Sequence, residues 1–468
     1  MLGRRARHAL LTGVVGLSIG SLLAACGNGS SAVPSGGGGG SGAASTSAHG
    51  SGKSLVEPRD AHGSITIWQS SSDGAPAYVA SFEKAYPHIK VKVVNSATST
   101  NDAAMVSAAA GHKLPDVTRS ADVDTYYFSS HGLFLDLSPY MKAYGYKPSQ
   151  YITGIMQLGQ YKGAQYVVPR GFDEAVTAYN PKVLKLFHLP TPKEGLTWSQ
   201  FQRDACAING KKVDGKTYYG VGTNLTNVSY ILYDAFVAST GGSAMNASQT
   251  KATLDSPKSL KGLTELTNFS RKCSSWMDNL PKSNDPFTSG RAAFDIVVPD
   301  QVLTWPNTKG TAWSTVNFPV NIVNFPLLSP HPEVGAGMIG LAATIDSKDQ
   351  KAAAAFEMWM LNKQGELAAS KSEGWIPLAN SLKSQDSWAA KYAFTQKAYH
   401  YTFNAPAFDS YTQDIVTPPA KLEVGSDGTS ATAISDAWTA VQLKKESVAQ
   451  AFTKATDTIN SWLQSQGS

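Results

Sequence analysis

One segment near residue 64 constrains the fold more than any other part of the chain, because strand and helix patterns alternate within residues 64–94. Residues 64–68 alternate apolar and polar side chains as a strand does, and apolar residues at helical spacing follow until Pro87 ends the helix. Residues 89–94 then predict a second strand. A strand, a helix and a second strand in this order predict a βαβ unit, so the expected fold class is α/β with a largely parallel sheet.

Further helices and strands are predicted along the rest of the chain, and no repeat of fixed period interrupts them. A strand near Asp116 leads into a polar and aromatic stretch, expected as a loop, that ends at His131. An alanine-rich helix is expected at 347–361, with Asp346 and Ser347 as its cap. The other expected helices are 101–110, 181–187, 198–208 and 257–273, and the other expected strands are 175–179 and 219–222.

The N-terminal segment has the pattern of an export signal. Arginines at positions 4, 5 and 7 precede an uncharged apolar run over 9–23, which is shorter than the roughly twenty residues that span a bilayer. The run closes on Leu23-Ala24-Ala25-Cys26, which resembles the lipobox of bacterial lipoproteins, in which the cysteine is acylated. We therefore predict a signal peptide over 1–25, a lipidated Cys26, and a location outside the cytoplasmic membrane on an N-terminal lipid.

A glycine- and serine-rich segment follows Cys26 and includes five consecutive glycines at 36–40. Such a segment buries too little apolar surface to fold, so residues 26–62 are expected to form a flexible tether. An anchored protein needs a tether of this kind and a free one does not. The alternative is an ordinary signal peptide whose last residue is a cysteine.

Charge and residue spacing exclude several function classes. Without the three arginines of the predicted signal peptide, 37 basic residues face 35 acidic ones, and the two signs are interspersed, so nucleic acid is not an expected partner. The nine histidines lack metal-ligand spacing, so neither a metal nor a cofactor is expected. Cys206 and Cys273 could form a disulfide in an oxidising compartment or remain buried thiols.

Six motifs occur in order after Ser64, and each is weak alone. They are Phe82 with Pro87–Val91, Leu114–Val117 with Gly132–Leu137, Tyr161–Pro169 leading to Tyr179-Asn180, Thr197-Trp198, Phe287–Ala293, and Gly374–Pro377. Together they resemble the extracellular solute-binding proteins, family 1, of ABC importers, which is the carbohydrate-binding family that includes maltose-binding protein. The match runs from Ser64 to the C-terminus.

The resemblance implies a periplasmic-binding-protein-like type II fold, in which a hinge joins two α/β lobes and a ligand cleft lies between them. Lobe 1 would comprise 63–172 and 335–375, and lobe 2 would comprise 173–334 and 376–468. The chain would cross the hinge near Phe172-Asp173, near 329–334 and near Ile376. The implied function is that of a monomer without enzymatic activity, which captures a sugar such as a di- or oligosaccharide and delivers it to the permease subunits of an ABC importer.

Candidate ligand-binding residues follow from the same resemblance, because sugars are held by aromatic faces and by groups that bond their hydroxyls. Trp375 is expected to be the stacking platform, and Asp173, counted back from Tyr179-Asn180, a sugar-binding carboxylate. The other candidates lie in the first strand-to-helix loop, in the loop before His131, after a strand of lobe 2 and after Pro299: Gln69, Ser71 and Asp73; Asp122, Asp124 and Tyr126; Asn224 and Tyr230; Asp300 and Gln301.

Several of these residues also have a structural interpretation. Asp122 fits a helix cap, Tyr126 fits packing within the lobe, and Asp173 fits a structural hydrogen bond at the hinge. Two other functions stay open. The carboxylates could hold a cation such as a polyamine in the same fold, and a secreted glycosidase would need two facing carboxylates, which no spacing singles out. The amide and hydroxyl side chains among the candidates favour a sugar.

Overall fold

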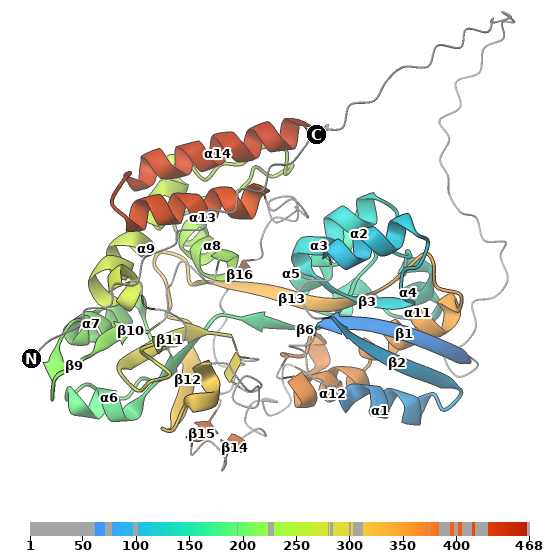
Figure 1. Cartoon of the computed structure of the whole chain (residues 1–468), viewed down its shortest axis with the longest axis horizontal. Coiled ribbons are helices and arrows are strands. Elements are labelled where there is room, and N and C mark those ends of the chain that lie inside the picture. Colours follow the sequence, from blue (N-terminus) through green and yellow to red (C-terminus); the bar gives the residue numbers. More distant parts are fainter. Residues whose placement is uncertain are drawn as a thin grey trace, which may run out of the picture. The chain divides into compact units, whose positions relative to one another are not determined.

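The structure of the chain is a computed structural model, and it consists of two mixed sheets covered by helices (Figure 1). It describes residues 61–70, 77–96, 102–193, 195–222, 229–278, 280, 284–298, 301–302, 312–373, 375–382, 394–396, 401–404, 414–416 and 429–465. The export signal, Cys26 and nearly all of the expected tether therefore lie outside the described residues.

The predicted βαβ unit is confirmed at the start of the first sheet. Strand β1 (Gly63–Ser70) pairs in parallel with β2 (Ile89–Ser96), and Gly63 lies opposite Ile89. Helix α1 (Ala77–Ala85) connects the two strands. The alternation of β1 buries Ile65 and Ile67 completely on one face, which is the burial that its sequence pattern predicts.

The first sheet has the order β16-β13-β3-β1-β2, with β6 also paired to β13. Its remaining strands are β3 (Val117–Ala121), β6 (Val168–Glu174), β13 (Glu333–Ala343) and β16 (Asp414–Val416). The accompanying elements are α2 (Asp102–Ala110), α3 (Asp122–Ser130), α4 (Ser138–Ala143), η3 (Pro148–Gln150), α5 (Thr153–Leu158), the hairpin β4 (Gln160–Tyr161) and β5 (Ala164–Gln165), α11 (Gln350–Met360), α12 (Lys363–Glu373) and η8 (Asn380–Leu382).

The second sheet has the order β10-β11-β7-β12-β15-β14. Its strands are β7 (Val176–Tyr179), β10 (Tyr219–Val221), β11 (Ala292–Val297), β12 (Val320–Asn324), β14 (Phe394–Gln396) and β15 (Tyr401–Asn404). The accompanying elements are α6 (Pro181–Leu186), α7 (Trp198–Ile208), the hairpin β8 (Lys212–Val213) and β9 (Lys216–Thr217), α8 (Ser229–Ser239), α9 (Pro257–Cys273), η4 (Ser275–Asp278), η7 (Ala312–Thr315), α13 (Thr429–Gln442) and α14 (Val448–Ser465).

The expectation of a largely parallel sheet holds around the βαβ unit, where β1 pairs in parallel with β2 and β3, but both six-stranded sheets are mixed. In the first sheet β13 runs antiparallel to β3 and β6, and in the second sheet β7 runs antiparallel to β11 and β12. Strands β6 and β7 follow one another with only Ala175 between them. The chain thus enters the second sheet directly from a strand of the first, without the crossover helix that parallel strands require.

Two predicted elements differ from the structure for reasons that involve distant residues. The stretch expected as a loop before His131 is helix α3, which begins at Asp122. The alanine-rich helix α11 begins at Gln350, three residues later than expected, because the Ser347 hydroxyl donates a hydrogen bond of 2.7 Å to Asp116 and does not cap the helix. In contrast, α7 and α9 have the predicted bounds, with side-chain caps from Thr197 and Ser256.

Two large hydrophobic clusters of buried residues form the interior. We call the cluster that runs from Ala61 to Phe172 and from Ala336 to Leu382 the first core. The second core runs from Ala175 to Val334 and from Ala433 to Leu463. The chain passes from one core to the other near two of the predicted hinge crossings, between Phe172 and Ala175 and between Val334 and Ala336. At the third predicted crossing, near Ile376, it does not change core, because residues 376–382 pack in the first core.

Three segments at or next to the predicted hinge crossings lie side by side: strand β6, strand β13 and the segment at Ile376. Strand β6 pairs with β13, and Figure 1 shows the two strands next to each other. Phe172 of β6 also forms an isolated antiparallel bridge with Ile376. The assignment of these segments to a hinge, and of residues to two lobes, stays a prediction.

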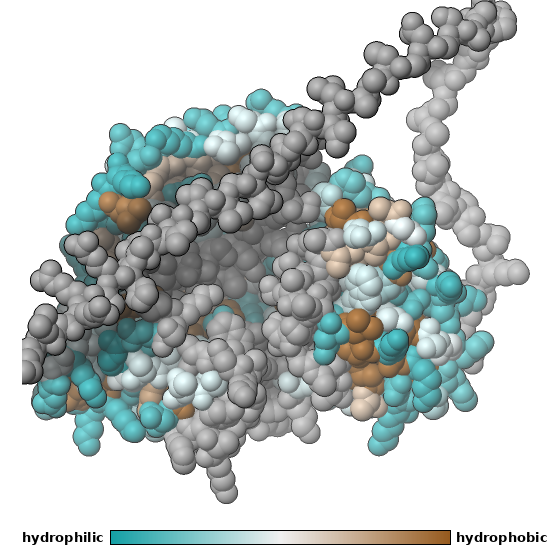
Figure 2. Space-filling model, in the orientation of Figure 1, coloured by the Kyte–Doolittle hydropathy of each residue, from teal (hydrophilic) through white to brown (hydrophobic). Residues whose placement is uncertain are grey.

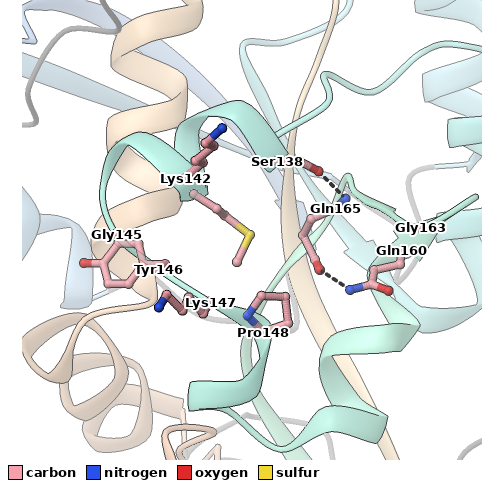
Figure 3. Close-up of a pocket in the computed structure, with 10 residues that line it drawn as sticks. Ser138, Lys142, Gly145, Tyr146, Lys147, Pro148, Gln160, Gly163 and Gln165 are labelled. Carbon is pink, nitrogen blue, oxygen red and sulfur yellow. Dashed lines mark hydrogen bonds between the residues drawn. The ribbon is translucent and has the colours of Figure 1, made fainter.

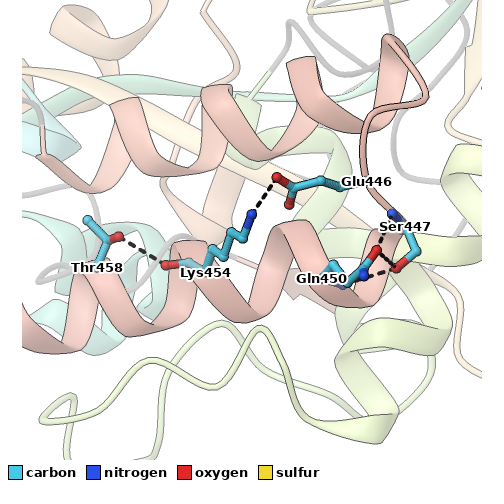
Figure 4. A network of polar contacts seen from close by, with 5 residues as sticks. All are labelled: Glu446, Ser447, Gln450, Lys454 and Thr458. Carbon is cyan, nitrogen blue, oxygen red and sulfur yellow. Dashed lines mark hydrogen bonds and ion pairs between the residues drawn. The ribbon is translucent and has the colours of Figure 1, made fainter.

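The C-terminal helices α13 and α14 form a hairpin that packs onto the second core through Trp438 and Phe452. Polar contacts fix its turn, where Lys454 forms an ion pair of 2.6 Å with Glu446, and Ser447 and Gln450 cap the start of α14 (Figure 4). Within the described ranges, none of the helices combines the length and the apolar character needed to cross a membrane.

The surface of the described part is mostly hydrophilic, and Figure 2 shows separate apolar patches on the visible face. Five large apolar side chains are exposed on described residues, and they are dispersed over the sequence: Val94, Val106, Leu186, Ile345 and Leu443. Isolated apolar residues of this kind are normal on a protein surface and indicate no interface.

Candidate functional site

Two of the candidate residues, Asp173 and Trp375, lie on neighbouring backbone segments. Phe172 and Ile376 exchange two backbone hydrogen bonds of 3.0 and 2.9 Å, Asp173 follows Phe172, and Trp375 precedes Ile376. The structure therefore joins segments two hundred residues apart in the sequence, and it brings the backbone of Asp173 close to that of Trp375.

Gly171 makes this approach possible. Its φ is +153°, and a Cβ atom at this position would lie 2.6 Å from the Cβ of Trp375 and 2.8 Å from the carbonyl oxygen of Ile376. Any other residue would push the Trp375 segment away from β6. The glycine is thus required by the contact between the two candidate segments.

Asp173 and Trp375 are both buried. Asp173 is 5% exposed and lies opposite Gly337 of β13. Trp375 is 7% exposed, so a sugar ring can stack on its indole only after neighbouring parts of the chain move away. The Ser370 hydroxyl donates a hydrogen bond to the carbonyl oxygen of Trp375 and fixes the backbone there.

Beside Trp375 the first core contains a buried arginine that the sequence analysis missed. Arg170 is completely buried, and its Nη1 donates a hydrogen bond of 3.1 Å to the hydroxyl of Tyr78. The guanidinium carbon lies 5.8 Å from the ring centroid of Trp375 and 6.0 Å from that of Tyr78. A sequence signal existed, since Arg170 is the only basic residue of the buried strand β6, which also contains Asp173 and Glu174.

Buried carboxyl groups were also missed. Burial raises the pKa of Glu357 well above its usual range, and the charge of Arg170 opposes this shift. Burial raises the pKa of Glu366 to about 7, although the Ala379 N–H donates a hydrogen bond of 2.9 Å to it. In the second core, burial raises the pKa of Asp234 to about 8. Glu357 and Asp234 are each the single acid of a largely apolar helix, whereas Glu366 lies in a polar helix that also contains Glu373.

Gln69 was predicted to lie in the first strand-to-helix loop, but it lies in a strand. It is the second-last residue of β1, it is completely buried, and its amide Nε2 donates a hydrogen bond of 3.3 Å to Asn95 of β2. The strand extends further than predicted because β2 pairs with it as far as Ser70.

Asp122, Asp124 and Tyr126 lie on α3 instead of a loop, at the carboxyl end of β3. The Asp122 carboxylate accepts a hydrogen bond of 3.0 Å from the N–H of Met338 in β13, and the Asp124 carboxylate accepts one of 3.0 Å from the N–H of Ala121. The Tyr126 ring packs edge-on against Tyr161, with the ring centroids 5.4 Å apart. These contacts are structural, and two of them account for the start of the helix.

Most of the remaining candidates lie outside the residues that the structure describes. Gln301 is half-buried, and its N–H donates a hydrogen bond of 3.1 Å to the carbonyl oxygen of Val298. Tyr230 lies on α8, in a part of the helix whose side chains are not described. The candidates outside the described residues are Ser71, Asp73, Asn224 and Asp300.

A separate pocket of about 300 Å³ lies between α4, η3 and the β4–β5 hairpin (Figure 3). Met141, Tyr146 and Pro148 supply apolar surface, and Lys142 and Lys147 are its charged lining residues. The buried Gln165 amide is already bonded to Gln160 and to two backbone carbonyls. The pocket includes neither Asp173 nor Trp375.

The structure joins Cys206 of α7 to Cys273 at the end of α9 by a disulfide. Among the residues that are described, no group of three histidine, cysteine, aspartate or glutamate side chains could hold a metal ion.

Comparisons with known proteins agree with this architecture. Residues 77–396 match the family described as "Bacterial extracellular solute-binding protein". No curated protein sequence matches the chain.

Solved structures of low sequence identity share the fold. They include the ABC substrate-binding protein Lmo0181 from Listeria monocytogenes (21% identity, TM-score 0.67, 86% of this chain and 99% of that one). The GacH receptor of Streptomyces glaucescens is similar (19%, 0.63, 86% and 99%), as is UgpB from Mycobacterium tuberculosis (18%, 0.68, 87% and 100%). The chain has the two-lobed α/β fold of periplasmic binding proteins, and it belongs to the bacterial extracellular solute-binding proteins.

Proposed function

We propose that this protein is the solute-binding component of an ABC importer, and that it captures a sugar, in particular a di- or oligosaccharide, and delivers it to the permease. The observation that carries the proposal is the meeting of the Trp375 and Asp173 segments at the bridge between Phe172 and Ile376. An indole face and a carboxylate are the two devices that sugar sites use.

The solutes of similar structures support a sugar. Lmo0181 was solved with cycloalternan, GacH with acarbose, and a cyclo/maltodextrin-binding protein with maltotetraose. UgpB was solved with glycerophosphocholine, so the fold alone does not select a sugar. The specific argument for a sugar is therefore the pairing of Trp375 with Asp173.

In the proposed mechanism the two lobes move about the strands that join them, and the sugar is enclosed between them. Trp375 would cover the apolar face of one sugar ring, and Asp173 would accept hydroxyl hydrogen bonds. The protein binds and releases its solute unchanged, as a monomer without enzymatic activity. Cys26 would carry the lipid that keeps it at the outer face of the cytoplasmic membrane.

A thermal-shift panel tests the proposal. The panel contains maltotetraose, mannobiose, acarbose and cycloalternan, with spermidine, putrescine and glycerophosphocholine as non-sugar solutes. A sugar at a hundredfold excess over its Kd adds about 2.7 kcal/mol to the free energy of unfolding, which raises Tm by several degrees. A shift with spermidine or glycerophosphocholine and none with sugars would overturn the carbohydrate assignment. Release of reducing ends from a bound oligosaccharide would instead indicate a glycosidase.

A further inference from the structure

We propose that Arg170 is a positioning residue that holds the Trp375 indole in a single orientation from within the first core. The role of that orientation in sugar binding rests on the proposed function, but the contact between the two side chains does not. Arg170 is completely buried and lies against the Trp375 ring, so we expect any effect that it has on binding to act through the indole.

The guanidinium of Arg170 contacts two aromatic rings at once. Its carbon lies 5.8 Å from the Trp375 centroid and 6.0 Å from the Tyr78 centroid, while Nη1 donates a hydrogen bond of 3.1 Å to the Tyr78 hydroxyl. A cation over an aromatic face is attracted more strongly when both are desolvated. Tyr78 thus orients the guanidinium, and the guanidinium in turn orients the indole.

The backbone around Trp375 is already fixed by other groups. Ser370 donates a hydrogen bond to its carbonyl oxygen, and Ile376 exchanges two backbone hydrogen bonds with Phe172. Gly171 lets the segment approach β6 closely. The main freedom left to Trp375 is rotation of its side chain, and the Arg170 guanidinium lies against that side chain.

Glu357 of α11 is a second buried titratable group in the first core, and burial raises its pKa well above its usual range. It is completely buried, the charge of Arg170 lowers its pKa against the effect of burial, and neither carboxylate oxygen accepts a hydrogen bond from a described residue. Glu357 therefore does not hold Arg170 in a bidentate hydrogen-bonded pair. The rings of Tyr78 and Trp375 both contribute to the position of the guanidinium.

The test is ¹⁹F NMR of protein labelled with 5-fluorotryptophan, with the Trp375 resonance assigned by its loss in Trp375→Phe. Arg170→Met combined with Glu357→Gln removes the buried cation together with the buried acid whose ionised form its charge favours. We expect the Trp375 resonance to shift and broaden in this variant, and to return part of the way in Arg170→Lys. The matched control is Arg291→Met, because Arg291 lies 5.8 Å from the Tyr219 ring in the second sheet region.

An unchanged Trp375 resonance in the double variant would overturn the proposal. If that variant does not fold, Arg170→Lys decides alone, because an ammonium cannot reproduce the planar contact and an unmoved resonance again overturns it. The affinity for maltotetraose should fall about three- to thirtyfold in the double variant. In a Trp375→Ala background the same change should cause no further loss.

A failure of the proposed sugar-binding function and a failure of the positioning role of Arg170 give different results. If the resonance responds as expected but no sugar of the panel binds, the proposed function fails and the positioning role stands. If maltotetraose binds, and loss of Arg170 weakens it equally with and without Trp375, Arg170 does not act through the indole.

Discussion

The two cores of the molecule are stabilised in different ways. The second core brings Trp198, Phe201 and Phe269 together with ring centroids 4.5–5.7 Å apart, and a disulfide closes the helices that carry them. The first core instead buries Arg170, Glu357 and Glu366. Burying charges costs stability that aromatic packing does not. The second core also buries a carboxyl group, Asp234, so the cores differ in another respect: Arg170 of the first core lies against Trp375, a candidate residue of the site, whereas a disulfide crosslinks the second core.

The largest expected effect concerns the disulfide of the second core. Replacing Cys206 and Cys273 by alanine opens a loop with a sequence separation of 67 residues. In the chain-entropy model this lowers the free energy of unfolding by about 4 kcal/mol. Urea unfolding of a soluble form that lacks Cys26 measures the loss. An unchanged midpoint, or two free thiols in unfolded and unreduced wild-type protein, would contradict the role given to the disulfide.

The next effect concerns the candidate site beside the first core. Asp173→Ala leaves sugar hydroxyls without a partner, which costs about 1–3 kcal/mol, or one to two orders of magnitude in affinity. Isothermal titration calorimetry with the sugar that gives the largest thermal shift measures this loss of affinity. Asp457→Ala, an exposed acid on α14, is the control and should leave affinity unchanged. Equal affinity in Asp173→Ala and wild type would remove Asp173 from the site.

A third effect is the dependence of the free energy of unfolding on pH, which the buried acids of the two cores cause. Burial raises the pKa of Asp234 from 3.8 to about 8, so between these values the folded state binds a proton that the unfolded state has lost. Stability therefore falls as the pH rises through this window, by about 1.4 kcal/mol per pH unit for one group. Glu366, with its pKa raised from 4.5 to about 7, adds the same slope over a narrower window.

Asp234→Asn tests this slope, because it keeps the shape of the side chain and removes its titration. Urea unfolding at pH 5, 6, 7 and 8 should give a flatter dependence for Asp234→Asn than for wild type, while Asp457→Asn should follow wild type. Parallel curves for all three proteins would show that Asp234 ionises normally in the folded state.

The smallest expected effect on binding is that of the proposed anchor. A flexible coil of the length of the expected tether would span roughly 25–30 Å, so we expect the folded part not to depend on the lipid. Cys26→Ala should release the protein from the membrane fraction and leave its sugar affinity unchanged. Cell fractionation and titration of the released protein check both halves, and continued membrane association of the variant would contradict lipidation at Cys26.

The sequence by itself determined the elements whose signals are local. Helices α7 and α9 have the predicted bounds because Thr197, Ser256 and Pro257 cap or begin them within one turn. The βαβ unit was predictable because β1 carries its burial pattern in its own alternation. The order of the motifs was enough to identify the family, since it needs no knowledge of contacts.

Only the tertiary structure decided features that depend on partners far along the chain. Helix α3 begins where Asp122 bonds to Met338, and α11 begins late because Ser347 bonds to Asp116. Both partners lie more than two hundred residues away. The same holds for the candidate site, where Arg170 meets Trp375 through β6 and the bridge to Ile376. A buried charge is visible in a sequence, but its partner is chosen by the fold, because burial alone does not say which side chain shares the space.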